Sequence, residues 1–536
     1  MLPFQPLGVI VPFIALTAFA LPLFSLIIKN KKFYDAYVLI VGIIAFAASL
    51  AIVLEVYRQD MPIIYAFGGW PPAIGITYEA DLFNSILGLF TATVMLFIII
   101  YSLWYTRHMD DYVWYYTLLL GLEAGLLGCL YTGDAFNLFV MIEVLSISAY
   151  GLVAYYRSKP QAIEAAIKYG MIGAVATTLY FLALVFIYAS FGTLNMADIA
   201  LKAKGAVDIN HISGEYYGNI IAASAVALAL ALWTFTFKSA LFPNHFWLPD
   251  AHPEAPTPVS AALSGLVVNV GVYATVRFMY TLFGEGTVVD TSGFRTVVFT
   301  ALLILGILSG LIGALLMIVQ NDIKRLLAYS TISHIGLIYM GASIGLAAST
   351  EIQELGLTAM LFHIINHGVG KALLFLAAGI LIHAAKTRDL DKMSGIGRLY
   401  PIASASLVLG FLQLMGFPPF GGFYSKLMLY QAFLTAGLII PAIMIVIISA
   451  ISVLGYVKAI YAAIFMPPRP EFKEIPKLDY VSIITFIMGI VCILLGILAP
   501  FIIPVLSNSI EESLLPLGIN KYIDAFYRAL EMLIPS

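Results

Sequence analysis

A lysine lies deep in an apolar stretch of this sequence. Lys238 follows a run that begins at Ile220 and contains no other charged residue, and Pro243 comes soon after it. Proline lacks a backbone N–H and breaks a helix. Because a charge at the centre of a bilayer costs about 2.5 to 3.5 kcal/mol, such residues are usually paired or line a wet cavity. Lys238 is therefore predicted to be functional; the alternative is a structural lysine whose long stem reaches the membrane interface.

Residues that can hold protons recur in other apolar stretches. His363, His367 and Lys371 are spaced four residues apart and so share one face of a helix. A row of titratable groups on one face suits a proton relay, which His334 on the preceding apolar stretch would extend. The alternative is that neighbouring helices simply satisfy these histidines. The HxxxH spacing also suits a metal, but no third ligand or HExxH glutamate accompanies it, so no metal site is predicted.

Two glutamates also lie in apolar surroundings. Glu143 is in the middle of the string DAFNLFVMIEVLSISAYG, and Glu123 lies in the apolar stretch before it. An ionised carboxylate beside Lys238 favours the charged lysine, and separating the two groups removes that effect. Glu143 is therefore predicted to control the loading and release of a proton at Lys238, with Glu123 as a secondary candidate. The alternative is a static buried ion pair.

A second apolar stretch is interrupted near a lysine. The string FLQLMGFPPFGGFYSKLMLY contains several Gly and Pro residues, and Lys426 follows them. Two broken helices that carry a lysine, five helices apart, predict a duplication in which helices 4 to 8 match helices 9 to 13. Because five is an odd number, the repeats would be inverted in the membrane, as in many transporters. Unwound backbone near the midplane would then line the ion path.

The composition indicates the class of protein. The chain has 536 residues, of which 61% are hydrophobic and 11% charged, about half the charged fraction of ordinary globular proteins. An integral protein of a lipid bilayer is therefore predicted. The net charge of −3 without a basic stripe predicts no nucleic-acid partner. No cofactor is predicted in this chain, because Cys129 and Cys492 form no ligand pair and no Rossmann fingerprint or P-loop occurs.

The apolar stretches predict an all-α polytopic membrane protein with about fourteen transmembrane helices, of which helices 7 and 12 are broken. Fifteen of the 27 Lys and Arg residues would lie in connections on one side and seven on the other, so the positive-inside rule places both termini outside. The predicted helices lie near 7–28, 36–57, 81–104, 112–131, 135–156, 164–190, 220–242, 256–282, 297–319, 325–348, 356–384, 401–438, 440–466 and 478–505.

These helices fall into four predicted parts. Residues 1–111 contain helices 1 to 3, residues 112–282 the first five-helix repeat, and residues 297–466 the second. Residues 478–536 contain helix 14 and a final amphipathic segment that begins at Ser509. That segment is too polar to span, so it is predicted to lie on the membrane surface or to dock on a neighbour.

The sequence resembles the antiporter-like subunits shared by respiratory complex I, archaeal membrane-bound hydrogenase-type complexes and multisubunit cation/proton antiporters, most of all the shorter hydrogenase-type and antiporter members. The matching strings are GDAFNLFVMIEVLSISAYGLVAY, KPQAIEAAIKYG with FGTLN, FPNHFWLPDAHPEAPTPVSA, NDIKRLLAYSTISHIG, HIINHGVGKALLF and GFPPFGGFYSK. The resemblance implies that Glu143, Lys238 and Lys426 form a charged axis at mid-membrane. The residues implied to link them are His334, His363, His367 and Lys371.

One position departs from the family. Where the family usually has a lysine in helix 8 shortly before GVY, this chain has Asn269 in VVNVGVYA. Asparagine can bind water but does not titrate, so the link between Lys238 and Lys426 would run through water or be impaired. Lys458 in helix 13, the repeat-mate of helix 8, is a candidate substitute.

The sequence thus predicts a proton-translocating subunit, with proton/sodium exchange as a variant, of a redox-driven complex of the complex I or membrane-bound hydrogenase type in the cell membrane. Its predicted partners are other membrane subunits and peripheral iron–sulfur subunits, which would carry the redox chemistry. The first alternative is a subunit of a multisubunit cation/proton antiporter driven by an ion gradient. A stand-alone solute transporter and a structural subunit that no longer pumps are the others.

Overall fold

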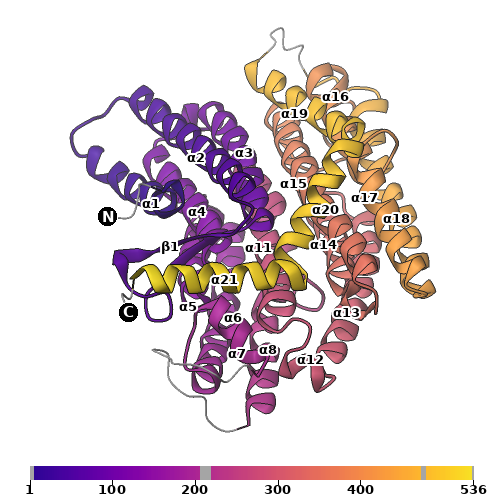
Figure 1. Ribbon diagram of the computed structural model, residues 1–536. Helices are drawn as coiled ribbons and strands as arrows, with labels where there is room; N and C mark the ends of the chain where they lie inside the picture. The colour runs from indigo at the N-terminus through magenta and orange to yellow at the C-terminus, as the bar shows by residue number, and fades with distance from the viewer. Residues whose placement is uncertain (1–4, 206–218, 473–478, 534–536) are drawn as a thin grey trace.

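The computed structural model describes residues 5–205, 219–472 and 479–533. Its helices stand side by side in a single bundle (Figure 1). Each of the fourteen predicted segments contains helix, and twelve helices in the described ranges are long and apolar enough to cross a membrane. The helix Ile323–Ala342 (α14) and the broken pair Pro401–Met415 (α16) and Gly421–Thr435 (α17) are not among those twelve. The all-α polytopic fold is therefore confirmed, while the count of fourteen stays a prediction.

Three long helices and a hairpin form the N-terminal part. The helices are Pro6–Phe24 (α1), Lys31–Gln59 (α2) and Leu82–Tyr105 (α3). Strands Ile63–Ala66 (β1) and Thr77–Ala80 (β2) pair antiparallel between α2 and α3. The hairpin is not predicted from the sequence, because four-residue strands are too short for a recognisable alternating pattern. Short 3-10 turns lie between the two strands at Phe67–Gly69 and after α3 at Thr106–His108.

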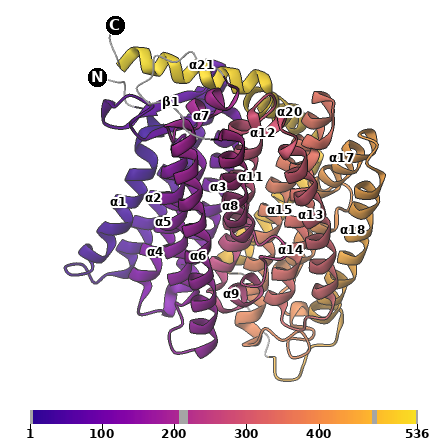
Figure 2. The same cartoon turned by 90° about the horizontal axis from the view of Figure 1, so that it is seen from below.

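The next helices form the first predicted repeat. Its last span is one continuous helix, Thr257–Leu282, that changes between α and π geometry. A short helix, Met196–Ala203 (α7), lies at one end of the bundle (Figure 2). The other elements are Tyr112–Tyr131 (α4), Ala135–Val153 (α5), Pro160–Phe191 (α6), Ile220–Lys238 (α8), Leu248–Glu254 (α9), Thr257–Ala262 (α10), Leu263–Val267 (η3), Val268–Val276 (α11) and Arg277–Leu282 (η4).

The second predicted repeat has a similar order of elements. Its fourth helix is broken, like that of the first, and its fifth also ends in a π turn. The inverted relation between the repeats stays a prediction. The elements are Val288–Thr291 (α12), Phe294–Ile318 (α13), α14, Ser343–Leu346 (η5), Thr350–Ala385 (α15), Ile396–Arg398 (η6), α16, α17, Ile439–Ile460 (α18) and Tyr461–Phe465 (η7).

Both predicted breaks are present. The first comes at Lys238 itself, where α8 ends before Pro243. The second separates α16 from α17 and depends on glycine: Gly416 has a φ of 78°, in the region that favours glycine. A Cβ on Gly422 would collide with the Gln413 carbonyl oxygen, so a larger residue would force the two half-helices apart.

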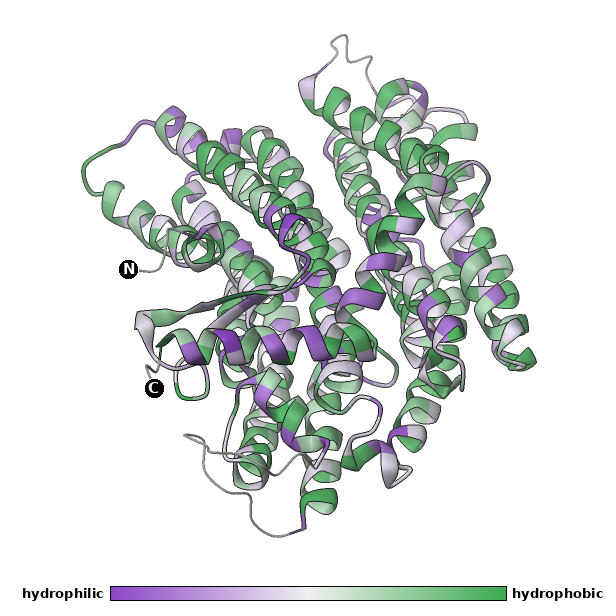
Figure 3. Cartoon of the chain, in the orientation of Figure 1, coloured by the Kyte–Doolittle hydropathy of each residue, from purple (hydrophilic) through white to green (hydrophobic). Residues whose placement is uncertain are grey.

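The bundle has two ends, which we call the α21 face and the α9 face. The last helices, Tyr480–Ile497 (α19) and Ala499–Leu514 (α20), lead to Pro516–Leu533 (α21), which lies across one end, while α9 lies at the other (Figure 2). Hydrophobic residues predominate along the spanning helices, and several hydrophilic residues lie along α21 (Figure 3). Exposed apolar side chains such as Phe19 and Phe501, each 74% exposed, fit a lipid-facing surface.

The predicted amphipathic segment, which begins at Ser509, forms the end of α20 and the whole of α21. Its buried residues include Ile519, Tyr522, Ile523 and Phe526, spaced three and four residues apart, and Ile519 and Ile523 pack with Ala200 of α7. The structure thus shows docking on α7, one of the two arrangements predicted for this segment. Lys473 and Lys477, which contribute to the predicted charge bias, and the last three residues lie outside the described part of the chain.

An aspartate in place of Ile519 should release α21 from the α21 face. The substitution removes about 2 kcal/mol of apolar burial, which should speed trypsin cleavage at the exposed Arg528 by roughly thirtyfold. Limited proteolysis of the purified protein in lipid nanodiscs measures this rate. Leu517→Asp is the control, because Leu517 is 49% exposed; equal cleavage rates for the two variants would contradict the docking.

Candidate functional site

Lys426 occupies the second helix break. It lies in the first turns of α17 and reaches back so that its Nζ donates to the carbonyl oxygens of Leu414 at 2.7 Å and Met415 at 3.2 Å. These carbonyls belong to the last turn of α16, where helix carbonyls lack partners and carry partial negative charge. The residue is 8% exposed. The break therefore supplies the ligands for a buried ammonium group.

Lys238 is held differently, at the end of α8. Its Nζ donates to Ser146 Oγ at 2.6 Å and to the Tyr150 hydroxyl at 3.2 Å, both on α5. The ammonium also lies 6.0 Å from the ring centroid of Tyr169, within the range of a cation–π contact. Lys238 is 1% exposed. Hydroxyl groups and aromatic rings, rather than a carboxylate, surround this charge.

Glu143 makes no ion pair with Lys238 in this structure, where both residues are described. It is half-buried on α5, three residues before Ser146 and seven before Tyr150, and so shares their face of the helix. The interpretation as a static buried ion pair is therefore wrong. Ser146 of α5 contacts Lys238 and lies about one helical turn from Glu143. Any influence of Glu143 on Lys238 therefore acts over about that distance.

The predicted helix face of His363, His367 and Lys371 points toward α14. His363 shares a 3.0 Å hydrogen bond with His334, and the His367 ring stacks on His334 with centroids 5.4 Å apart. Lys371 Nζ donates to Ser330 Oγ at 2.6 Å and to the Leu327 carbonyl oxygen at 2.9 Å. All four predicted residues of this region are thus brought together.

Hydroxyl groups join these side chains into a continuous chain of hydrogen bonds. The Tyr456 hydroxyl contacts Ser330 Oγ at 2.5 Å and His334 Nε2 at 3.0 Å. At the other end, His363 Nδ1 contacts Ser425 Oγ at 2.9 Å, beside Lys426 in the sequence. We call the set the hydrogen-bonded row; in order, it consists of Lys371, Ser330, Tyr456, His334, His363 and Ser425.

The row has the chemistry of a proton relay. Hydroxyl and imidazole groups both donate and accept hydrogen bonds, so each member can pass a proton to the next. Lys371 and His363 lie eight residues apart on α15, so the row covers about 12 Å along the helix axis. Both ring nitrogens of His367 are buried and have no hydrogen-bond partner among the described residues, which leaves that ring beside the row.

Three members of the row are missed by the sequence analysis. Ser330 is four residues before His334 and shares its helix face, a spacing that would have revealed it. Tyr456 lies 122 residues from His334 and Ser425 lies 62 residues from His363. Nothing in the sequence around these two residues indicates their partners.

Lys324 is a further buried lysine, although the predicted charge bias counts it in a connection. It lies in the first turn of α14, 4% exposed, and donates to the Ala255 carbonyl oxygen at 2.8 Å and to Ser260 Oγ at 3.2 Å. A pocket of about 450 Å³ on the α9 face is lined by Lys324 and by the exposed His383 and Lys386. Lys324 precedes Leu327, whose carbonyl accepts from Lys371, so one helical turn links the pocket to the row.

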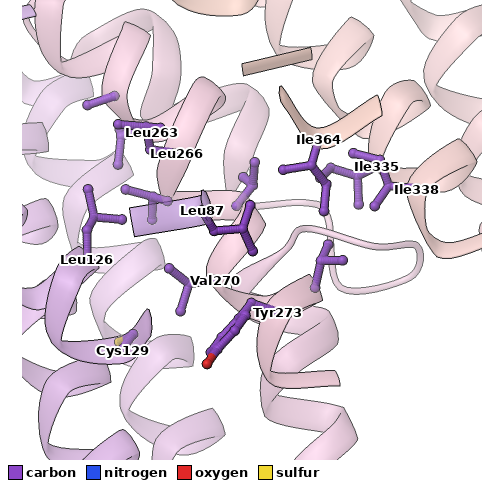
Figure 4. Close-up of a cluster of buried hydrophobic side chains, with 14 of the residues drawn as sticks. Leu87, Leu126, Cys129, Leu263, Leu266, Val270, Tyr273, Ile335, Ile338 and Ile364 are labelled. Carbon is purple, nitrogen blue, oxygen red and sulfur yellow. The ribbon is translucent and has the colours of Figure 1, made fainter. Parts of the chain in front are cut away.

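Asn269 lies where the two halves of the bundle meet. Its amide donates to the Gly265 carbonyl oxygen at 2.7 Å, and its Oδ1 is buried without a hydrogen-bond partner among the described residues. It borders a cavity of about 10 Å³, enough for one water molecule at most. Figure 4 shows the apolar layer around this cavity, which includes Leu126, Val270 and Ile364.

Two other candidates lie away from the row. Lys458 donates to the carbonyl oxygens of Ile318 and Gln320 at the end of α13, where it caps that helix. The structure therefore does not place Lys458 between Lys238 and Lys426, and its suggestion as a substitute link is wrong. Glu123 is fully buried, and neither of its carboxylate oxygens has a hydrogen-bond partner in the described residues.

Within the described residues, no group of three or more His, Cys, Asp or Glu side chains could hold a metal ion. His334, His363 and His367 bring three rings together, but the nitrogens of His334 and His363 contact serine, tyrosine and one another, and those of His367 have no partner among the described residues. The chemistry that this set of residues supports is proton transfer.

Comparisons with known proteins show similarity over most of the chain. The family model for NADH:quinone oxidoreductase/Mrp antiporter, TM, matches residues 132–452. A Na(+)/H(+) antiporter subunit of Alkalihalophilus pseudofirmus is 31% identical over 405 residues, 75% of this chain and 76% of that protein. An NADH-quinone oxidoreductase subunit of Desulforudis audaxviator is 30% identical over 505 residues, 90% of this chain and 94% of that protein.

A solved structure shares the fold. One chain of the membrane-bound sulfane sulfur reductase, an archaeal respiratory membrane complex, aligns with a TM-score of 0.86 and 26% identity. The alignment covers 98% of this chain and 100% of that chain. The predicted resemblance is therefore confirmed by sequence and by structure.

Replacing Tyr456 by phenylalanine should destabilise the bundle. The change removes the hydroxyl that joins Ser330 to His334, so both buried groups lose a hydrogen-bond partner. The free energy of unfolding should fall by about 1 to 3 kcal/mol. Thermal unfolding of the purified protein should show a lower midpoint. Tyr461→Phe is the matched control, since Tyr461 is 57% exposed in the next turns of the same helix; equal midpoints would contradict a hydrogen-bonded Tyr456.

Proposed function

Because the chain belongs to the NADH:quinone oxidoreductase/Mrp antiporter transmembrane family, we propose that it moves protons across the membrane as one subunit of a redox-driven, multisubunit ion pump. The chain is an antiporter-like, multi-pass membrane subunit. The observation that carries the proposal is the hydrogen-bonded row, which leads from Lys371 to Ser425 beside Lys426 at the second helix break.

Protons enter this path from the α9 face. The pocket lined by Lys324 is the entrance, and Lys371 one turn further along receives the proton. The row then carries it to Lys426, which releases it toward the α21 face along α17. In the first half, Lys238 is the corresponding proton-binding residue, and Glu143 modulates it. Asn269 with a bound water links the two halves. Exchange of protons for sodium on the same residues is a variant of this path.

The proposed orientation places the α9 face in the cytoplasm and both termini outside the cell membrane. The excess of Lys and Arg in connections on the α9 side supports it. Both ends of the described chain lie at the α21 face (Figure 2), as an even number of spans requires.

The energy must come from partner subunits. Moving one charge against 100 mV costs about 2.3 kcal/mol, and the sequence contains no dinucleotide fingerprint or P-loop. We place the electron transfer in peripheral iron–sulfur subunits, with further membrane subunits between them and this chain. The similarity to a chain of an archaeal respiratory membrane complex along its whole length supports this version.

A second candidate is a subunit of a cation/proton antiporter driven by an ion gradient. The specific observation in its favour is the 31% identity with the Na(+)/H(+) antiporter relative. The path through Lys324, the row and Lys426 is the same in both versions, and only the driving force differs.

Alanine at Lys238 or at Lys426 should reduce ion translocation by the assembled complex by roughly tenfold or more, because proton-transfer groups typically contribute at least that much. Glu143→Gln should act in the same direction, and Glu143→Asp more mildly. The rate is measured as acidification of vesicles that contain the complex. Lys458→Ala is the matched control, a lysine that caps α13 away from the row. Undiminished transport by both alanine variants in an intact complex would overturn the channel assignment.

The driving force can be tested by purifying the complex through a tag on this chain. The redox version predicts that iron–sulfur subunits co-purify and that an electron donor drives acidification. Mass spectrometry and iron analysis identify the subunits. A complex without iron that moves protons when a sodium gradient is imposed would contradict the redox version and establish the antiporter.

A further inference from the structure

A second group of charged side chains is buried at the α21 face, away from the row. Arg277, in the last turns of the span Thr257–Leu282, pairs with Asp81 at 2.7 Å and with Glu79 at 3.4 Å. Glu79 lies on β2 and Asp81 caps the start of α3. The three side chains are 2% to 3% exposed. We call Glu79, Asp81 and Arg277 the carboxylate cluster.

The cluster holds one more acid than it can neutralise. Two carboxyl groups share a single guanidinium, which never loses its proton. Burial, and then the charge of Asp81, raises the pKa of Glu79 well above its ordinary value, although Arg277 opposes this. Burial and the neighbouring carboxyl group therefore favour the protonated form of Glu79.

The cluster has unused hydrogen-bonding capacity. Asn84 donates to Glu79 Oε2 at 2.8 Å, and the Tyr273 hydroxyl accepts from Arg277 Nε at 3.0 Å. Tyr522 of α21 is the other titratable side chain that faces Glu79. Glu79 Oε1 and Arg277 Nη1 are buried and have no hydrogen-bond partner among the described residues. When Glu79 holds a proton, it can donate a hydrogen bond to the neighbouring Asp81 carboxyl group.

A line of side chains connects the cluster to the centre of the molecule. Asn269, Tyr273 and Arg277 are spaced four residues apart and share one face of their helix. Asn269 and Tyr273 both border the central cavity, together with Leu126 and Leu130 of α4. Glu123 lies three and seven residues before those leucines, on the same face of α4. The line therefore begins at the Asn269 cavity and ends at Glu79.

The cluster also has an exit to the solvent. Asp81 borders a pocket of about 290 Å³ with Asp60, Glu512 and Lys521. Lys521 of α21 pairs with Asp60 and Glu512, and the Asp60 side chain is 78% exposed. A proton that leaves Glu79 by way of Asp81 thus reaches a hydrated, mainly acidic surface.

We propose that the carboxylate cluster is a second proton exit, which serves the half of the molecule that contains Lys238. A proton reaches the Asn269 cavity, passes along Tyr273 through water to ionised Glu79, and leaves through Asp81 into the pocket. The cluster changes from a net charge of −1 to zero when Glu79 binds the proton and returns to −1 when it is released. Arg277 balances the remaining carboxylate throughout. This inference rests on the proposed function, since it adds an exit to the same translocating subunit.

The test uses Glu79→Gln in the assembled complex, with proton translocation into vesicles as the readout. Glutamine keeps the shape and the acceptor for Asn84 but cannot release a proton, so this exit should close while the Lys426 exit stays open, and the rate should fall by roughly half. Glu79→Asp, which can still titrate, should restore part of the rate. Asp290→Asn is the control, because Asp290 pairs with Arg295 and belongs neither to the carboxylate cluster nor to the line of side chains that leads to it. This variant should keep the full rate.

Three outcomes would overturn the exit: a full rate for Glu79→Gln, an equal loss for Glu79→Asp, or an equal loss for Asp290→Asn. If Glu79→Gln does not assemble, Tyr273→Phe takes its place, since it keeps the ring and removes the hydroxyl; a full rate for this variant would also overturn the exit. A lost rate in Lys426→Ala beside a full rate in Glu79→Gln leaves the proposed function intact and removes only this inference. An unchanged rate in both Lys238→Ala and Lys426→Ala removes the proposed function itself.

Discussion

The burial of ammonium groups inside a membrane is the constraint on which the rest of this structure depends. Lys426 is satisfied by carbonyls of the broken α16, Lys371 by the Leu327 carbonyl and Ser330, and Lys238 by Ser146 and Tyr150. All of these partners are neutral. A lysine paired with a buried carboxylate would leave that carboxylate charged and unpaired when the lysine loses its proton. A lysine held by carbonyls and hydroxyls leaves no such unpaired charge.

Close helix packing brings these partners within hydrogen-bonding distance. Glycines allow α13 and α14 to touch, since a Cβ on Gly336 would collide with the backbone nitrogen of Gly310, and small residues permit such approach in membranes. This contact fixes the face of α14 that carries Ser330 and His334. That face then meets α15 and Tyr456 of α18, so the row depends on a glycine contact that contains none of its members.

The features that could be predicted from the sequence are those that a single helix determines. Apolar length predicts the spans, Gly and Pro predict the breaks, and the four-residue spacing predicts the shared face of His363, His367 and Lys371. The partners of that face come from helices distant in sequence, so Tyr456 could not be found. The pairing of Glu143 with Lys238 fails for the same reason: the sequence shows both groups but not that Ser146 and Tyr150 lie nearer.

The two halves of the molecule are not equally connected. From Lys371 to Ser425 every step is a hydrogen bond, whereas between Lys238 and that row lies the apolar layer around Asn269, with space for one water molecule at most. A single water bridged to the free Oδ1 of Asn269 would complete a path, and its immobilisation costs about 2 kcal/mol or less. Under the proposed function, exchange between the halves therefore follows the hydration of this cavity. A neutral asparagine suits that position, because a permanent charge there would keep the cavity wet and the two halves joined.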